Sequence, residues 1–450
     1  MISLNNLLKS VVKSAEEYHH LNDNFSKTRD SLIKEKTESE VVIINPTHDG
    51  NGDFELARKL EKLLITKGLQ VAIISLIRKY NPDSYESISG ASKKLKNKLV
   101  VIAPFSFCSP KALIKAFKNN VIVHEKMKIL MIDEIEANSQ DSFHDYKHAF
   151  KRIGIEHVYE EKLGFGENCI GYLPIRKSEC TTIKQRLKIE LEKLFDSFNL
   201  NVDSSAHYYV SYLSSDIKIT ASQVFIVNTL CELQDNPSSV NYIFSLGNGN
   251  WESDVERMSR GTCDILPFLE EINKDIADKF SKVNIILVDV YKNKTFHKEL
   301  QNKRREGIPI NVIFMNSKQM PKNIWHNFIA ISKSGIMTGD QSLCDYLSLK
   351  KEMPFYEMQY WKWPLRQSLI DNAEKFGGKE LKEYVQTKFF GRMPPYGDIF
   401  YQFANRSMLN DQLKSDFQNF GAFLSQKIAN DSIEAYLKST NLLESEQKIS

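Results

Sequence analysis

The stretch EVVIINPTHDGNGDFELARKLEKLLITKGLQVAIIS, residues 40–75, decides the fold class. It opens with the apolar, β-branched run EVVIIN (40–45) and closes with a similar run, QVAIIS (70–75). Between them, FELARKLEKLLITKG places apolar residues at helical spacing and ends at Gly68. Short apolar runs are typical of buried strands, and apolar residues three and four apart are typical of helices. Strand, helix and strand in this order predict a βαβ unit and a parallel sheet.

The same alternation runs through most of the chain and is interrupted once. The first series continues with strands expected at KLVVIAP (98–104), MKILMID (127–133) and EHVYEE (156–161). The passage 176–206 has one charged helix and a polar end, which indicates a domain junction. The second series predicts a connecting strand at 207–213, a helical segment at 263–280, and strands at 241–247, 283–290, 310–315 and 328–335.

A chain of 450 residues is too long for one core, so these two series predict two domains. The expected class is α/β, with two Rossmann-like βα domains that face each other across a cleft and with helical extensions at both ends. The expected divisions are an N-terminal helical segment (1–38), an acceptor domain (39–180), a junction (181–206), a nucleotide-sugar domain (207–400), and C-terminal helices with a polar tail (401–450). The roles of the two domains follow from the resemblance described below.

Composition excludes several classes of protein. The chain is 42% hydrophobic and 26% charged with a net charge of +3, which is ordinary for a globular protein and argues against one that coats nucleic acid. None of its 6 cysteines forms a C-x-x-C pair, which favours reduced thiols. No run approaches the roughly 20 apolar residues of a membrane-spanning helix. We therefore expect no nucleic-acid partner and no transmembrane segment.

The loop NPTHDGNGDFELARKL (45–60) follows the first expected strand. Gly50 and Gly52 allow a tight turn and a close approach of the backbone to a ligand. Asp49 and Asp53 flank these glycines, and Asp53 lies near the expected start of a helix. Asp53 can therefore cap the helix, or it can serve as a general base if its carboxylate reaches a proton to be removed.

A second glycine loop, SLGNGNWESDVERMSR (245–260), follows a strand of the second series. Gly247, Asn248 and Gly249 precede a helix that carries Arg257, so this loop can bind an anion at a helix N-terminus. It lacks the third glycine of the dinucleotide fingerprint, and a plain tight turn is the alternative.

The third loop lies in SGIMTGDQSLCDYLSLKKEMPFYE (334–357). Gly339 exposes backbone at the start of an expected helix, where free amides and the helix dipole suit a diphosphate. Glu357 follows a short apolar run and can hold the hydroxyls of a ribose or sugar, or it is an ordinary surface acid. The residues predicted to bind the diphosphate-containing ligand here are Thr338, Gly339, Gln341, Ser342 and Glu357.

The domain plan and two of these loops resemble GT-B glycosyltransferases. The motifs DGNGDFELARKL (49–60) and TGDQSLCDYLSLKKEMPFYE (338–357) are similar to those of the bacterial protein-arginine rhamnosyltransferases that modify elongation factor P. Three positions depart from the second motif of that family: Thr338 stands for arginine, Asp340 for glutamate and Gln341 for aspartate. The resemblance covers two motifs and the domain plan.

The resemblance implies sugar transfer from a nucleoside diphosphate sugar, with no metal or other cofactor required. Asp53 takes the role of general base with Asp49 as its neighbour, and Asp340 the acidic role near the sugar or phosphate. Gln341 and Ser342 contact the donor phosphates or nucleotide. The acceptor is open, with a protein as one candidate. Arg257, Arg260 and Lys333 are the expected cations for the charge on the leaving diphosphate.

Two other classes of function fit the same sequence. One is a nucleotide-sugar-binding or scaffold protein without turnover, and the other is a GT-B-like epimerase or phosphorylase. His144 and His148 lie four apart and could share a metal, but no third ligand is evident and a polar helix face explains them. The usage of lysine, asparagine and isoleucine suggests an AT-rich bacterial genome, and the reduced thiols favour a cytoplasmic location. The tail with Glu444 and Glu446 is similar to C-terminal signals of effectors secreted into host cells.

Overall fold

The computed structural model describes residues 40–47, 52–78, 85–87, 99–106, 108–124, 126–137, 142–183, 203, 205–246, 251–289, 294–302, 306–315, 322–394, 397–403 and 410–442. These residues divide into two compact units. The first unit comprises the described residues of 40–174, 361–369 and 426–442, and the second unit those of 175–360 and 370–425. The chain thus returns to the first unit twice, and the C-terminal helices are divided between the units.

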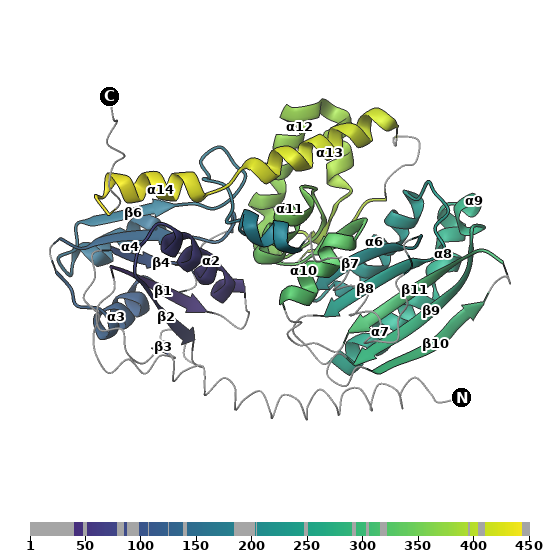
Figure 1. Ribbon diagram of the computed structural model, residues 1–450, viewed down its shortest axis with the longest axis horizontal. Helices are drawn as coiled ribbons and strands as arrows, with labels where there is room; N and C mark the ends of the chain where they lie inside the picture. The colour runs from purple at the N-terminus through teal and green to yellow at the C-terminus, as the bar shows by residue number, and fades with distance from the viewer. Residues whose placement is uncertain are drawn as a thin grey trace. The chain divides into compact units, whose positions relative to one another are not determined.

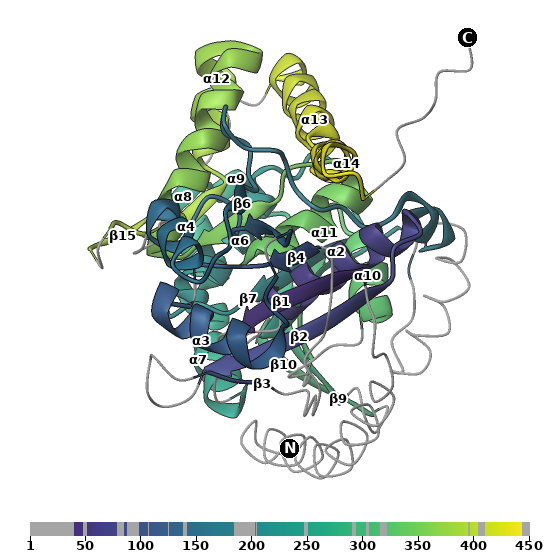
Figure 2. The ribbon, with the colours of Figure 1, turned by 90° about the vertical axis from the view of Figure 1, so that its left-hand side faces the viewer.

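The first unit contains a six-stranded sheet in the order β3-β2-β1-β4-β5-β6. All neighbouring pairs are parallel except β2 and β3. The strands are β1 (Val41–Thr47), β2 (Val71–Arg78), β3 (Tyr85–Ser87), β4 (Leu99–Ile102), β5 (Lys128–Ile132) and β6 (His157–Glu161). The helices are α2 (Gly52–Thr66), α3 (Pro110–Asn120), α4 (Phe143–Lys151) and α14 (Asn430–Ser439). Helices α3 and α4 lie next to each other, with the sheet between them and α2 (Figures 1 and 2).

Local sequence explains these elements. The first six residues of β1 are buried, as expected for a strand covered on both faces. Helix α3 starts with Ser109, whose side chain accepts from the amide of Ala112, and with Pro110 in its first turn. Aromatic residues of α3 and α4 then pack together, and the rings of Phe117 and Phe150 meet edge to face.

The second unit contains a nine-stranded sheet in the order β10-β9-β11-β8-β7-β12-β13-β14-β15. Its strands are β7 (His207–Leu213), β8 (Val240–Leu246), β9 (Phe280–Asp289), β10 (Lys294–Asn302), β11 (Ile308–Met315), β12 (Ser334–Met337), β13 (Phe355–Met358), β14 (Phe389–Arg392) and β15 (Ile399–Phe400). The edge strands β10 and β15 are antiparallel to their neighbours, and the other pairs are parallel. The helices are α6 (Lys218–Cys231), α7 (Trp251–Cys263), α8 (Ile265–Ile272), α9 (Lys274–Ala277), α10 (Lys322–Ile331), α11 (Asp340–Lys350), α12 (Trp363–Gln386) and α13 (Asp411–Gln426). The start of α12, up to Leu369, belongs to the first unit.

The strand order fixes where a ligand site is expected in the second unit. Strand β7 is the first strand of the second unit in sequence order, and it lies between β8 and β12 in the sheet. The chain first forms the strands on one side of β7, which are β8 to β11. It then crosses to the other side of β7 and forms β12 to β15. Open α/β sheets bind ligands at such a reversal, outside the carboxyl ends of the strands. The loops that follow β7 and β12 flank this point.

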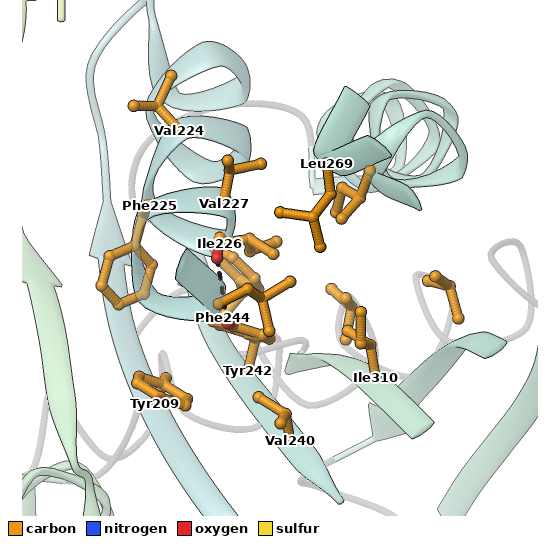
Figure 3. Close-up of a cluster of buried hydrophobic side chains, with 14 of the residues drawn as sticks. Tyr209, Val224, Phe225, Ile226, Val227, Val240, Tyr242, Phe244, Leu269 and Ile310 are labelled. Carbon is orange, nitrogen blue, oxygen red and sulfur yellow. Dashed lines mark hydrogen bonds between the residues drawn. The ribbon is translucent and has the colours of Figure 1, made fainter. Parts of the chain in front are cut away.

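A large apolar cluster supports that sheet. Helix α6 is apolar around most of its circumference because it is buried against the sheet and against α8. Figure 3 shows Phe225 and Val227 of α6 with Tyr242 of β8, whose hydroxyl donates to the Ile226 carbonyl at 3.3 Å. The rings of Tyr209 and Tyr242 stack with centroids 4.9 Å apart. This core holds the carboxyl ends of β7 and β8 in fixed positions.

The structure confirms the α/β class and the two βα series, and it corrects two elements. The strand predicted at 328–335 is wrong, because α10 continues to Ile331 and β12 occupies Ser334–Met337. Trp325, Phe328 and Ile329 lie three and four apart and bury one helical face, which the strand prediction missed. The segment 207–213 is the central strand β7 rather than a connecting strand. Among the described residues, no helix is long and apolar enough to span a membrane.

Candidate functional site

Glu357 organises the carboxyl edge of the second unit. It lies on β13, is 0% exposed, and its carboxylate accepts four hydrogen bonds. The donors are the amide of Ser214 at 3.0 Å, the amide of Ser215 at 3.2 Å, the hydroxyl of Ser215 at 2.7 Å and the hydroxyl of Thr338. Burial raises the pKa of Glu357, and these donors oppose that rise. One carboxylate therefore fixes the loops that follow β7 and β12.

Helix α11 begins at this edge with an open N-terminus. Its N-cap is Gly339, which has no side chain to occupy the free amides of the first turn. Gly339 has φ of +85°, a conformation that favours glycine, and an added Cβ would meet no atom within 4 Å. Thr338, directly before it, is fully buried and directs its hydroxyl to Glu357. The start of α11 thus offers amide donors and space for an anion.

Polar side chains of the first turn of α11 complete this region. Asp340 is buried, and its carboxylate lies 3.5 Å from the hydroxyl of Tyr356 on β13. The side-chain oxygen of Gln341 is buried and, among the residues that the structure describes, has no hydrogen-bond partner. Ser342 is partly exposed. Gln341 therefore has an acceptor available for a hydroxyl or N–H group.

The loop after β7 carries charged residues that tie it to its neighbours. Asp216 accepts from Nε of Arg392 at 2.8 Å, and Arg392 ends β14 at the same edge of the sheet. Lys218, at the start of α6, forms a buried ion pair with Asp254 of α7 at 2.7 Å. Asp216 is well exposed, so its pair with Arg392 is weak and can exchange with another anion. Arg392 is therefore a cation available at this edge.

The cations expected from the sequence lie elsewhere. Arg257 is exposed on α7, near the middle of that helix, and Arg260 is exposed and pairs with Glu256. Lys333 precedes β12 and so lies at the opposite end of that strand from Thr338. The expected role for Lys333 at the start of α11 does not fit this placement. Gly247, Asn248 and Gly249 lie outside the described residues.

The first unit has its own polar carboxyl edge, at the equivalent reversal between β1 and β4. Asn45, near the end of β1, is fully buried and donates to the Asp53 carbonyl at 2.9 Å and to the Ala103 carbonyl at 2.7 Å. These bonds join the start of α2 to the loop after β4. Asp53 is buried in the first turn of α2, as predicted for a residue near a helix start. Asp49 lies outside the described residues.

Further acids follow β5 at this edge. Asp133 is buried and accepts a hydrogen bond from the Ser106 hydroxyl, and burial raises its pKa. Lys362, brought back by the segment 361–369, contacts Glu134 at 2.9 Å and the Ile135 carbonyl at 2.9 Å. The carboxylate of Glu136 accepts from the Phe165 amide at 2.8 Å. Asp133 therefore lies at the same edge of the sheet as Asn45 and Asp53, with β4 between its strand and β1.

Sequence analysis did not identify several of these residues. No sequence motif marks Ser214, Ser215 or Arg392. Their roles depend on strands that are distant in the sequence. Asp133 carried a usable signal, because it ends an apolar strand in the run MKILMID. Among the described residues, no group of three or more His, Cys, Asp or Glu could hold a metal. The rings of His144 and His148 stack on the surface of α4.

No protein-family model matches the chain, and no curated protein matches it. Solved structures with a similar fold include the N-terminal domain of Candida albicans trehalose-6-phosphate phosphatase, with 8% identity over 92% of this chain and 98% of that one and a TM-score of 0.40. The trehalose 6-phosphate synthase of Burkholderia multivorans has 10% identity over 91% and 100%, with a TM-score of 0.39. S. aureus MnaA, solved with UDP, has 12% identity over 92% and 99%, with a TM-score of 0.40. Likenesses at this level assign no activity.

Proposed function

We propose that the chain is a glycosyltransferase that moves a sugar from a nucleoside diphosphate sugar to an acceptor. The observation that carries this proposal is the open N-terminus of α11 at the strand reversal of the second unit. Gly339 leaves amides and space there, and Glu357 holds the two flanking loops in place. A diphosphate is the ligand chemistry that suits such a terminus best. The expected GT-B arrangement, with the acceptor bound by the first domain and the nucleotide-sugar by the second, is part of the same proposal.

In this proposal the second unit stabilises the leaving diphosphate. Bond cleavage at the sugar places additional negative charge on the phosphate oxygens, and fixed donors lower the energy of that state. The amides at the start of α11 supply donors that need no reorganisation, because Gly339 already holds its turn. Arg392 exchanges Asp216 for a phosphate oxygen and adds a positive charge. Gln341 accepts a hydroxyl or N–H of the nucleoside.

The first unit supplies the base in this proposal. Asp53 remains the proposed general base for the acceptor, and its main chain is fixed by Asn45. Asp133 is a second carboxylate at the same edge, and burial raises its pKa. An inverting reaction needs one such base, so the proposal assigns deprotonation to Asp53 and binding of the acceptor to Asp133.

Binding of the donor is the first test. Calorimetric titration of the full chain with UDP, GDP, dTDP and CMP should show saturable binding of one nucleotide family. Arg392→Met should weaken that binding about tenfold or more, the loss expected for one charge-assisted phosphate contact. Lys274→Met, which removes an exposed cation from α9 of the same unit, should leave it unchanged. A folded protein that binds none of these nucleotides would refute the donor site.

Turnover then separates an enzyme from a silent binder. Asp53→Asn should keep the affinity for the donor and lower sugar transfer at least a hundredfold, because general-base catalysis typically contributes about 10² to 10⁴ in rate. Asp133→Asn should instead raise the KM for the acceptor. Conversion of the donor without any acceptor would indicate an epimerase. Donor binding with no conversion of any kind would indicate a nucleotide-sugar-binding or scaffold protein.

A further inference from the structure

The first unit carries a hollow at the edge of its sheet opposite to the acids described above. This hollow of about 400 Å³ is lined by Lys118, Val121, Ile122, Val123, Arg152 and Ile153. Val121 follows α3 and leads toward β5, and Arg152 caps α4 and leads toward β6. The hollow therefore lies at the amino ends of the strands, away from the proposed chemistry.

Two consecutive aliphatic side chains project beside this hollow. Ile122 is 42% exposed and Val123 is 36% exposed. The other large apolar side chains that are exposed in the described part of the chain are isolated in the sequence. Single exposed apolar residues are normal on protein surfaces, whereas a contiguous pair next to a hollow marks a contact surface.

Exposed basic side chains line the hollow at Lys118 and Arg152 and continue along α3 and α4. They are Lys111, Lys115 and Lys118 of α3, Lys126 of the following loop, Lys147 of α4, and Arg152. All six are exposed, and within the described residues none of them forms an ion pair. The first three lie at positions i, i+4 and i+7 on one side of α3, and α3 packs beside α4 (Figure 2). We name the six basic residues with Ile122 and Val123 the α3–α4 face.

The charge of this face contrasts with the chain as a whole, which has 60 basic and 57 acidic residues. Asp145 and Glu156 are described acids near the face, and its six basic residues outnumber them. Asp145 accepts from Ser142 in a capping box, and Glu156 lies 3.7 Å from Lys151. The face is thus a local positive region on a nearly neutral protein, and it attracts a polyanion.

We infer that the α3–α4 face docks onto an anionic lipid surface. Lysines and arginines near a membrane are attracted to acidic headgroups, and exposed aliphatic side chains enter the boundary between headgroups and acyl chains. A nucleic acid fits less well, because single strands are held by exposed aromatic rings, whereas Phe117, Tyr146 and Phe150 are fully buried. A bound free phosphate also fits poorly, because α3 and α4 turn their C-terminal carbonyls toward the hollow.

The hollow and the aliphatic pair of this face lie at the amino ends of the strands, apart from the acids at the carboxyl edge of the first unit. The membrane then sets the location of the protein, and the acceptor approaches from the aqueous side. This inference does not depend on the proposed sugar transfer, since the two sets of residues are separate. Failure of nucleotide binding and failure of membrane binding are therefore distinct results.

The test is partitioning of the full chain onto vesicles, followed by sedimentation. Binding is expected to vesicles of phosphatidylcholine with phosphatidylserine, weaker at high salt, and not to phosphatidylcholine alone. Each Lys or Arg near such a surface contributes about fivefold to the partition coefficient. The variant Lys118→Glu/Arg152→Glu should therefore lower it at least about 25-fold. Ile122→Ser/Val123→Ser should lower it about tenfold on the same vesicles, by removing the inserted aliphatic groups.

Matched control variants test whether the loss of vesicle binding is specific to the α3–α4 face. Lys177→Glu/Lys274→Glu makes the same change of charge at exposed lysines of the second unit, and Ile65→Ser removes an exposed aliphatic side chain from α2. Both should partition like the wild type. The inference is overturned if the wild type does not bind acidic vesicles, or if both face variants bind them as well as the controls do. It is also overturned if inorganic phosphate or single-stranded RNA competes fully at concentrations where vesicles are saturated.

Discussion

Glu357 gives the sharpest prediction about the architecture of the second unit. Replacing it by alanine removes the carboxylate that accepts from two half-buried backbone amides, those of Ser214 and Ser215, and from the hydroxyls of Ser215 and Thr338. Each buried amide left without a partner costs about 1–3 kcal/mol. Removing a buried carboxylate also removes its desolvation cost, which offsets part of this loss. We expect Glu357→Ala to lower the free energy of unfolding by about 3–5 kcal/mol.

The variant Glu357→Gln removes the negative charge of the side chain and keeps its shape. The amide oxygen still accepts the two backbone N–H groups, and the Ser215 hydroxyl can turn to accept from the new NH₂ group. Since the donors keep an acceptor of the same shape and the desolvation cost of the charge is removed, the expected change in the free energy of unfolding is within about 1 kcal/mol. Glu380→Ala is the matched control, because Glu380 is exposed on α12 of the same unit. It should change stability by less than about 0.5 kcal/mol.

The pH dependence of the Gln variant has a definite sign. Burial raises the pKa of Glu357 in the folded protein above its unfolded value of about 4.3. The folded state therefore binds the proton more tightly, and this contribution to stability is full below the unfolded pKa and is lost as pH rises through the folded pKa. Glutamine does not titrate. The stability of the wild type relative to Glu357→Gln should be greatest at acid pH and should decrease as pH rises.

Two measurements test this reasoning. Calorimetric unfolding gives the change in stability of the second unit, and amide exchange reports directly on Ser214 and Ser215. Both amides should be protected in the wild type and in Glu380→Ala, and should exchange faster in Glu357→Ala. An alanine variant within about 1 kcal/mol of the wild type, with both amides still protected, would refute the role given to the carboxylate.

Three further substitutions test other parts of the two units. Gly339→Ala should destabilise the second unit by about 1–3 kcal/mol through its positive φ alone, while Gly52→Ala, which also meets no atom within 4 Å, should not; equal melting temperatures would contradict this. Lys388→Met should cost about 2–3 kcal/mol by leaving Glu232 without its cation, and adding Glu232→Gln should recover most of that loss in a double-mutant cycle. Asn45→Leu should lower the unfolding free energy of the first unit by about 2–4 kcal/mol, because two buried carbonyls lose their donor; denaturant unfolding would show this as a lower midpoint.

Sequence patterns predicted the buried strands and the α/β class because burial on both faces requires continuous apolar runs. They placed Gly339 correctly at a helix start, since a glycine after a short strand is a local signal. They misplaced the strand near residue 330, where the helical spacing of Trp325, Phe328 and Ile329 competes with a short apolar run. Periodicity cannot separate a buried helix segment from a strand of that length.

The candidate site was less predictable, because its bonds connect residues that are far apart in the sequence. Glu357 and Ser214 are hydrogen-bonded although they are 143 positions apart in the sequence, and no local sequence pattern predicts that pairing. The same holds for Arg392 and Asp216, which are 176 positions apart. Sequence analysis assigned Glu357 to the ligand, whereas the structure gives its carboxylate four donors from the protein. The assignment of Glu357 to the donor therefore stays a prediction, and a positioning role fits its contacts better.

The two carboxyl edges differ in the kind of polar group that they present. The edge of the second unit offers the open amides of α11 and the guanidinium of Arg392 as donors, beside the buried carboxylate of Asp340. The edge of the first unit offers acceptors, namely the carboxylates that follow β1 and β5 at Asp53 and Asp133. Donors favour a ligand that carries or gains negative charge, and carboxylates favour one that gives up a proton. This division is the one that the proposed transfer reaction requires, with donors for the anionic leaving group and a carboxylate for the hydroxyl or amine acceptor.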